Sequence, residues 1–390
     1  MVKVLVNATP LLAPLTGIGQ YIRHLFTAMD KMQLAELSML YGSRIEKGFR
    51  LPSPEGSAAP HKLKRLAKRF IPFSQTARRL AAHPLLHFRS TGSIKNTLYH
   101  EPNYLPMPFK GPLVLTLCDM SCFDHPETHP AERVRLMQHH LPAAIERASH
   151  LIVISDDSRR ALQRWFNVAD ERITTTYLAA DERFRPHSEL ELKGALNELG
   201  LAPQAYVLCV GTLEPRKNLS TLFAAYAGLP SELRKRFPLV VAGMSGWNTD
   251  QLMSDAGRLM REGDLRFLGY VKDELVPSLY AGAAAFCYPS RYEGFGLPAL
   301  EAMASGVPVL TTNRTSLPEV VGPAGLMVDP DDVGAMRDSL RALLEDKALA
   351  NRLAGMGLER AATFSWERCA RETASVYERI ALAEGLTRRH

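Results

Sequence analysis

Short apolar segments alternate with longer helical stretches along most of this chain of 390 residues. Such alternation is typical of parallel α/β sheets, in which a helix connects each strand to the next. Ser155, directly before Asp156 and Asp157, is the expected N-cap of a helix that follows one of these strands. From the alternation we predict strands over residues 2–6, 113–117, 151–154, 206–210, 239–241, 265–268 and 284–288.

The alternation starts twice, which indicates two domains. Residues 2–26 and residues 206–226 each run through a strand, a loop and a helix, and residues 184–188 between the two halves have the composition of a linker. A chain of this length exceeds one ordinary core and suits two domains of about 190 residues each. We therefore predict two doubly wound, Rossmann-like α/β domains that face each other across a cleft, at residues 1–184 and 185–369.

The most informative motif follows the last predicted strand and spans residues 288–306, YPSRYEGFGLPALEAMASG. Pro298 suits the first position of a helix, and Gly306 suits its C-terminal cap. Gly296 and Leu297 then lie at the N-terminus of that helix, where free N–H groups and the helix dipole can bind an anion. The motif therefore predicts an anion site beyond the end of a strand.

Two carboxylates flank this predicted anion site. Glu293 lies on the loop and Glu301 lies one turn into the helix. Carboxylates accept hydrogen bonds from the hydroxyl groups of sugars and ribose, so a polyhydroxylated ligand would explain the pair. The alternative interpretation is a tight turn followed by a glutamate that stabilises the helix dipole.

A second motif, GTLEPRKN at residues 211–218, also follows a predicted strand and opens a helix. Its adjacent Arg216 and Lys217 can hold a diphosphate, since a guanidinium binds phosphate oxygens in a bidentate way and an ammonium acts as a point charge. The alternative is a surface turn with solvated charges.

The two motifs, in this order and roughly 80 residues apart, closely resemble the retaining glycosyltransferases of family 4, which have the GT-B fold. The resemblance rests on Arg216 with Lys217, on Glu293 with Glu301, and on the run RFLGYV at residues 266–271. It covers most of the chain and is most specific between residues 211 and 330. It implies the GT-B fold, with a C-terminal helix over residues 370–390 that packs back on the first domain.

The resemblance implies a role for each matched residue. The two catalytic residues would be Glu293, which binds hydroxyls of the donor sugar, and Asp119, which lines the cleft. The ribose would bind Glu301, the base would bind the backbone near Val271, and the leaving diphosphate would be neutralised by the basic pair. The donor-binding residues that it implies are Gly17, Gly19, Arg216, Lys217, Val271, Gly294, Phe295, Gly296, Leu297 and Glu301.

The chain departs from the family pattern at two positions. Thr212 stands where many members have arginine, and Cys118 stands where members commonly have a histidine before Asp119. His125 and His129 could partly replace that histidine, or they could be structural or merely exposed. We expect residues 100–104, HEPNY, to line the acceptor side of the cleft, with a plain loop as the alternative.

We expect neither a metal ion nor another cofactor. Asp329 and Asp331 form a D-x-D pattern, but they precede an expected helix over residues 333–344, so N-capping explains the acidic run better. The five cysteines are scattered and odd in number, which argues against disulfides and zinc and favours the reducing cytoplasm.

A basic stretch without acidic residues lies between Glu55 and Glu101, and its residues 62–79 could form a basic amphipathic helix. Such a helix can bind anionic lipid, which would make the protein peripheral on the inner membrane. The alternative is a solvated basic face. Nothing in the sequence resembles a nucleic-acid-binding module.

The runs TGIGQY, HPETHPAERV and VGTLEPRKNL look most like mannosyltransferases of O-antigen or capsule assembly. The resemblance therefore implies a retaining glycosyltransferase of lipopolysaccharide biosynthesis, with GDP-mannose as donor and a lipid-linked glycan as acceptor. The alternatives are another nucleotide sugar, a different enzyme on this fold such as an epimerase or phosphorylase, and an inactive sugar-binding partner of a polysaccharide complex.

Overall fold

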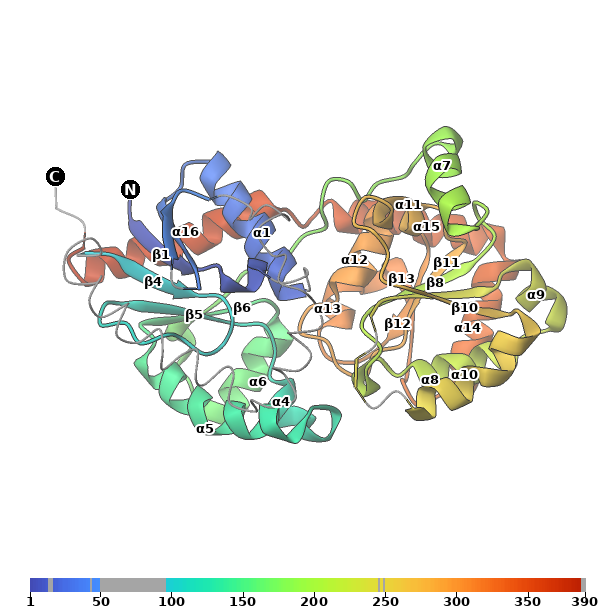
Figure 1. Cartoon of the computed structure of the whole chain (residues 1–390), viewed down its shortest axis with the longest axis horizontal. Coiled ribbons are helices and arrows are strands. Elements are labelled where there is room, and N and C mark those ends of the chain that lie inside the picture. The colour runs from blue at the N-terminus through green and yellow to red at the C-terminus, as the bar shows by residue number, and fades with distance from the viewer. Residues whose placement is uncertain (13–16, 43, 50–95, 245, 248–249, 387–390) are drawn as a thin grey trace.

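The computed structural model describes residues 1–12, 17–42, 44–49, 96–244, 246–247 and 250–386. Two sheets organise it into two lobes, which lie side by side in Figure 1. All strand pairs are parallel except one at the edge of the first sheet. The predicted fold, two doubly wound α/β domains, is confirmed. The predicted basic helix at 62–79 lies outside the described residues.

The first sheet has the strand order β3-β2-β1-β4-β5-β6-β7. Its central strands are buried on both faces because helices cover both sides, and such strands carry near-continuous apolar runs such as LVLTL in β5. Its strands are β1 (Lys3–Asn7), β2 (Glu36–Tyr41), β3 (Arg44–Lys47), β4 (Leu98–Glu101), β5 (Leu113–Leu117), β6 (His150–Val153) and β7 (Ile173–Thr175). Its helices are α1 (Gly17–Lys31), α4 (Ser121–Asp124), α5 (Ala131–Arg147) and α6 (Asp156–Phe166).

The second sheet has the strand order β10-β9-β8-β11-β12-β13. Its strands are β8 (Val207–Val210), β9 (Leu239–Ala242), β10 (Leu265–Gly269), β11 (Ala285–Tyr288), β12 (Val309–Thr312) and β13 (Gly325–Val328). Its helices are α7 (Glu189–Leu199), α8 (Leu219–Ala227), α9 (Ser231–Arg236), α10 (Asp250–Glu262), α11 (Val276–Ala281), α12 (Leu297–Ala304), α13 (Leu317–Val321), α14 (Val333–Glu345) and α15 (Lys347–Ala361).

Each predicted strand forms, with bounds that shift by at most one residue. The predicted cap also forms, since the Ser155 side chain accepts a hydrogen bond from the backbone N–H of Ser158 at the start of α6. The predictions did not include β2, β3, β4, β7, β12 and β13. In β4 the sequence LYHE mixes apolar and ionisable residues, which hides the strand. His100 and Glu101 are fully buried in this strand, so the expectation that they line the acceptor side is wrong for both.

The two polar side chains of β4 are buried because each has polar partners. His100 contacts the hydroxyls of Tyr377 at 2.5 Å and Thr116 at 2.7 Å through its two ring nitrogens. Glu101 accepts hydrogen bonds from Asn7 and Tyr99 at 2.8 and 2.7 Å. The contact with Tyr377 ties β4 to the C-terminal helix α16 (Trp366–Ala383), which also packs against α1.

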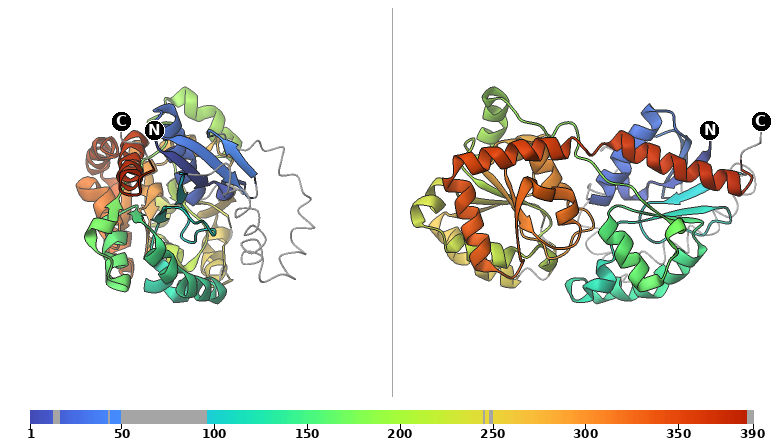
Figure 2. Two further views of the ribbon diagram at one scale, coloured as in Figure 1. Left: turned by 90° about the vertical axis from the view of Figure 1, so that its left-hand side faces the viewer. Right: turned by 180° about the vertical axis from the view of Figure 1, so that it is seen from behind.

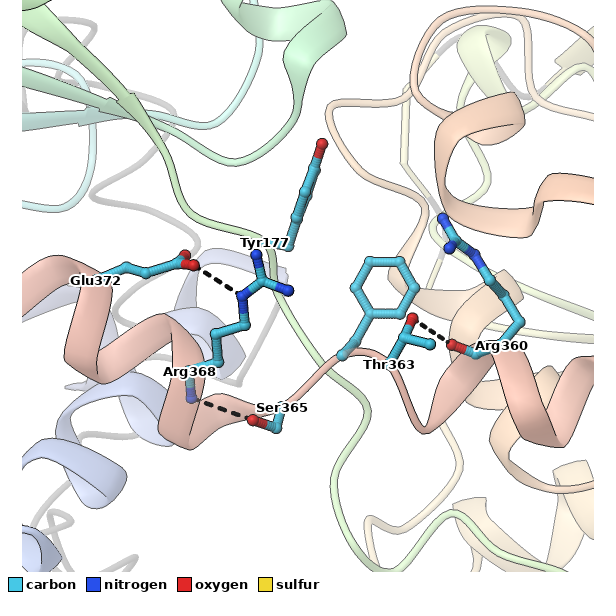
Figure 3. Close-up of a pocket in the computed structure, with 7 residues that line it drawn as sticks. Tyr177, Arg360, Thr363, Ser365, Arg368 and Glu372 are labelled. Carbon is cyan, nitrogen blue, oxygen red and sulfur yellow. Dashed lines mark hydrogen bonds and ion pairs between the residues drawn. The ribbon is translucent and has the colours of Figure 1, made fainter.

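The chain passes between the domains twice, through the segment after β7 and through the short segment between α15 and α16. Figure 2 shows α15 and α16, in red, running along one side of the second and the first domain respectively. A hollow that is open to solvent lies where the two crossings meet, between Tyr177, Arg360 and Arg368 (Figure 3). Across the described ranges, no helix is both long and apolar enough to cross a membrane.

Candidate functional site

Two glycines let the loop that follows β9 lie directly against the loop that follows β8. A Cβ atom on Gly243 would lie 1.9 Å from the carbonyl oxygen of Gly211, and one on Gly246 would lie 2.3 Å from that of Leu213. Hydrogen bonds fix the contact, since Leu213 donates to the Met244 carbonyl and Gly246 donates to the Leu213 carbonyl, both at 3.0 Å. The β8 loop, which carries the basic pair, is therefore held in one position.

Asn218 fastens the same loop to the rest of the strand ends. Its backbone has a φ of 56°, a left-handed conformation that asparagine tolerates better than most residues. Its buried side-chain amide donates to the carbonyls of Pro289 and Pro330 at 3.1 and 2.8 Å. One residue thus joins the loops that follow β8, β11 and β13.

The predicted basic pair and the first predicted carboxylate meet at this edge of the sheet. Lys217 Nζ lies 2.7 Å from Glu293 Oε1, and Arg216 contacts Glu293 Oε2 at 3.1 Å. Arg216 also contacts Glu214 at 2.6 Å and donates to the Tyr292 carbonyl at 2.6 Å. We call Glu214, Arg216, Lys217 and Glu293 the charged cluster.

The charged cluster is buried, and this sets its electrostatics. Glu293 is only 6% exposed. Burial alone would raise the pKa of Glu293, but the charges of Lys217 and Arg216 outweigh it and lower that pKa to about 2. Glu293 is therefore ionised at neutral pH. The Arg216 Nε–H has no partner among the described residues, so one donor of the guanidinium is left for a ligand.

Helix α12 begins beside the cluster as predicted. Gly296, at a φ of 99°, is the N-cap residue, no side chain caps the helix, and Pro298 lies in the first turn. Gly306 closes the helix with a φ of 73°, and its N–H donates to the Met303 carbonyl at 3.0 Å. The N–H groups of the first turn can therefore bind an anion next to Arg216.

The loop before α12 also contacts the first domain. A Cβ atom on Gly294 would lie 2.1 Å from the Cys118 carbonyl oxygen and 3.0 Å from the Asp119 Cβ atom. The Tyr292 hydroxyl accepts from the Met120 N–H at 3.2 Å and donates to Asp124 at 3.1 Å. Gly294 is therefore required in this conformation for the approach of the two domains.

The Phe295 side chain forms part of the contact between the domains. It is 2% exposed and belongs to the hydrophobic core of the first domain. Its ring centroid lies 6.2 Å from that of Tyr177 and 5.8 Å from that of Phe364, which lie on the two crossing segments. The Phe295 side chain is thus used for packing between the domains, which leaves its backbone for the predicted donor-binding role.

The Glu319 carboxylate also joins the two domains. Glu319, on α13, accepts hydrogen bonds from the backbone N–H groups of Asp156 and Asp157 at 2.7 and 3.1 Å. Those two groups lie at the N-terminus of α6, where a carboxylate interacts favourably with the helix dipole. Arg360 on α15 donates to the Glu319 carbonyl, which fixes α13 in turn.

Glu301 lies in a different environment from Glu293. Burial raises the pKa of Glu301 to about 8, and the neighbouring Tyr280 hydroxyl only partly offsets the effect. The charges that act on Glu301 come from Asp181, Arg183 and Asp273, in the crossing segment and in the loop before α11. The two predicted carboxylates, Glu293 and Glu301, therefore have different charged neighbours and opposite pKa shifts.

The remaining predicted donor-binding residues surround these carboxylates. Val271 is partly buried in the loop that follows β10, near Asp273. Gly17 and Gly19 lie in the first turn of α1, and a Cβ atom on Gly17 would meet no atom of the described residues within 4 Å. A ligand can therefore approach the backbone of α1 at Gly17.

Asp119 takes part in a chain of hydrogen bonds. Ser121 donates to Asp119 Oδ1 through its hydroxyl at 2.7 Å and through its N–H at 3.0 Å. His129 Nε2 lies 2.8 Å from the same hydroxyl. Of the two histidines that could replace the one missing at Cys118, His129 is thus joined to Asp119 through Ser121, whereas the His125 ring makes an edge-on contact with the Tyr292 ring.

The acidic run before α14 is held by arginines and by capping. Asp329 pairs with Arg314, and Asp331 pairs with Arg291, both at 2.5 Å. Asp332 accepts from the backbone N–H of Ala335 and so caps α14, as predicted. Within the described ranges no group of three or more histidine, cysteine or acidic side chains could hold a metal ion.

Sequence reasoning did not identify four residues that shape the site: Glu214, Asn218, Tyr292 and Glu319. Glu214 and Asn218 lie in the motif GTLEPRKN and Tyr292 lies in the motif at residues 288–306, but only for Glu214, two residues before Arg216, did the sequence offer a local signal. The contacts of the other three reach across 70 residues or more, so no local pattern indicated them.

Two parallel-sheet α/β domains in contact, with a buried charged cluster and a helix N-terminus at the strand ends of the second domain, define a glycosyltransferase of the GT-B class. Residues 197–359 match the family described as glycosyl transferases group 1. The chain is also 41% identical over 380 residues to the O-antigen chain mannosyltransferase B of Escherichia coli, a match that covers 96% of this chain and 99% of that relative. The chain therefore belongs to the glycosyl transferases group 1 family.

Solved structures share the fold at much lower identity. Sucrose-phosphate synthase from Thermosynechococcus elongatus has a TM-score of 0.75 and 21% identity, over 98% of this chain and 100% of that chain. HepE from Anabaena, in complex with UDP-glucose, has a TM-score of 0.71 and 18% identity, over 97% of this chain and 100% of that chain. The predicted GT-B fold is confirmed by these likenesses.

Proposed function

We propose that this protein transfers mannose from GDP-mannose to a lipid-linked glycan during O-antigen assembly, with retention of the anomeric configuration. The observation that carries the proposal is the charged cluster, in which two cations and a carboxylate meet at the N-terminus of α12. The near full-length similarity to an O-antigen chain mannosyltransferase supports mannose as the transferred sugar.

The cluster suggests how the donor binds. In the ligand-free protein, Glu293 is the anion that balances Lys217 and Arg216. A diphosphate brings its own negative charge to the two cations and so takes over the balancing role, assisted by the N-terminus of α12. The Glu293 carboxylate then becomes free to accept hydrogen bonds from hydroxyls of the donor sugar. Binding of the diphosphate and release of Glu293 for contact with the donor sugar therefore occur together.

The same charges favour departure of the nucleoside diphosphate. As the bond between the sugar C1 and the phosphate oxygen breaks, negative charge grows on the diphosphate, where Arg216 and Lys217 stabilise it. The acceptor hydroxyl forms its new bond to C1 on the same face, and its proton passes to the departing phosphate oxygen. These cations supply the charge that a metal ion would supply, so we propose that transfer needs no metal.

The acceptor and the membrane surface complete the proposal. The lipid-linked acceptor places the enzyme in the cytoplasm, peripheral on the inner membrane, with the basic stretch at 62–79 as its membrane contact. The support for this part is the sequence of that stretch and the electrostatic attraction between basic segments and anionic lipid.

The decisive experiment incubates the purified protein with GDP-mannose and a lipid-linked glycan, and follows GDP release and product mass. We expect transfer with GDP-mannose and none with UDP-glucose. Arg216→Gln and Lys217→Gln should each lower kcat by on the order of a hundredfold. The matched control is Lys235→Gln, because Lys235 is exposed and pairs with Glu232 within helix α9, outside the charged cluster. Tight donor binding without transfer to any acceptor would instead indicate an inactive sugar-binding partner.

A further inference from the structure

One buried ring nitrogen in the contact region between the domains lacks a hydrogen-bond partner within the described part of the chain. His129 is only 8% exposed, and its Nδ1 atom has no hydrogen-bond partner among the residues that the structure describes. An unpaired buried polar atom costs free energy, so such atoms are rare unless a bound molecule pairs with them. The atom therefore needs a functional explanation.

Hydrogen bonding determines which ring nitrogen carries the proton. The Ser121 hydroxyl has a single hydrogen, which it donates to the Asp119 carboxylate at 2.7 Å. The hydroxyl can then only accept from His129 Nε2, which lies 2.8 Å away. The Nε2 atom is therefore protonated, and the Nδ1 atom carries a lone pair that can accept a hydrogen bond.

The ring stays neutral in this environment. Burial lowers the pKa of His129, and the neighbouring cations Arg133 and Arg216 lower it further, against the opposing effect of Asp119 and Glu214. A neutral imidazole keeps the lone pair on Nδ1. Arg133 and Asp119 belong to the first domain, whereas Arg216 and Glu214 belong to the charged cluster of the second domain. The His129 ring therefore lies near both Asp119 and the charged cluster.

The second domain covers the ring from its other side. The Trp247 ring lies 6.2 Å from the His129 ring, and Trp247 Nε1 donates to the Thr128 carbonyl at 2.7 Å. The His129 ring therefore lies where Trp247 of the second domain meets the first domain.

We propose that His129 Nδ1 accepts a hydrogen bond from a sugar hydroxyl in the cleft, and that Asp119 and Ser121 hold the ring in the tautomer that permits this bond. The hydroxyl belongs to the donor sugar or to the acceptor sugar, the two polyhydroxylated molecules that enter this space. The inference rests on the proposed function and adds a substrate-binding residue to it.

Two substitutions separate the two nitrogens of the ring. His129→Gln keeps an amide N–H that can reach Ser121 but removes the acceptor at the Nδ1 position. His129→Asn keeps an oxygen close to the Nδ1 position but loses the contact with Ser121. We expect kcat/KM for transfer to fall about tenfold in H129Q and by less than about threefold in H129N, with melting temperatures close to that of the wild type. His139→Gln, on the exposed face of α5, is the control.

Binding measurements identify which sugar supplies the hydroxyl. Calorimetry compares GDP-mannose with GDP, and steady-state kinetics gives the KM of the acceptor. Weaker binding of GDP-mannose in H129Q, with GDP unchanged, assigns the hydroxyl to the donor sugar. Unchanged affinity for both, with a raised acceptor KM, assigns it to the acceptor. Either result supports the inference.

Three results would overturn it. H129Q could match the wild type in every measurement, GDP and GDP-mannose could both bind more weakly by the same factor, or the two variants could lose activity together with melting temperature. The last two indicate a structural role only. If the wild-type protein transfers no nucleotide sugar at all, the proposed function fails as well, whereas full activity in H129Q overturns the His129 assignment alone.

Discussion

Glu293→Gln should destabilise the ligand-free protein, because it removes the one carboxylate that contacts both Lys217 and Arg216. The magnitude follows from the pKa of Glu293, which the two cations lower from 4.5 to about 2 despite burial. That difference corresponds to about 3 kcal/mol of stabilisation at pH 7. It agrees with the ~3–5 kcal/mol typically lost when one member of a buried ion pair is removed.

The sign of the pH dependence follows from the same pKa. A carboxyl group whose pKa is lower in the folded protein stabilises the fold above its unfolded pKa, and this contribution is lost as the pH falls through the folded value. The difference in unfolding free energy between the wild type and Glu293→Gln should therefore be about 3 kcal/mol at pH 7. It should shrink as the pH falls from about 4.5 towards about 2, since the wild-type side chain then becomes neutral.

Urea unfolding followed by tryptophan fluorescence, repeated over this pH range, measures the difference directly. Glu232→Gln is the control, because its carboxylate is 84% exposed and pairs with Lys235. The double variant Glu293→Gln, Lys217→Met should recover part of the loss, because it removes the ammonium left unpaired. A difference below about 1 kcal/mol at pH 7, or one that does not change in acid, would refute the reasoning.

Three further predictions concern other parts of the site. We expect ionised Glu301 to accept hydrogen bonds from the ribose hydroxyls. Because burial raises the pKa of Glu301 to about 8, GDP affinity should then increase as the pH rises from 7 to 9, and calorimetry of Glu301→Gln should show no such increase. Glu319→Gln should lower the free energy of unfolding by about 1 kcal/mol and raise the radius of gyration in small-angle scattering, because an amide has only one oxygen for the two N–H groups of α6. Asn218→Ala should cost about 3 kcal/mol in urea unfolding, since two carbonyls lose their donor and alanine disfavours a φ of 56°; an unchanged midpoint would contradict this role.

The sequence by itself determined the features that depend on neighbouring residues. Apolar runs predicted strands such as β5 and β11 because a strand buried on both faces needs apolar side chains throughout. Ser155, Pro298 and Gly306 marked helix ends because caps act within one turn. The meeting of Arg216 with the loop after β11 was also predictable, because the carboxyl ends of parallel strands share one edge of the sheet.

Only the tertiary structure decided how those parts function together. The pKa of Glu293 depends on cations that lie 76 and 77 residues away along the chain. The burial of His100 depends on a hydroxyl from α16, and the close approach of Gly294 depends on the Cys118 carbonyl in the other domain. The lack of a hydrogen-bond partner for His129 Nδ1 among the described residues can be recognised only from the tertiary structure. Charge, burial and hydrogen bonding act through space, so contacts between distant segments determine them.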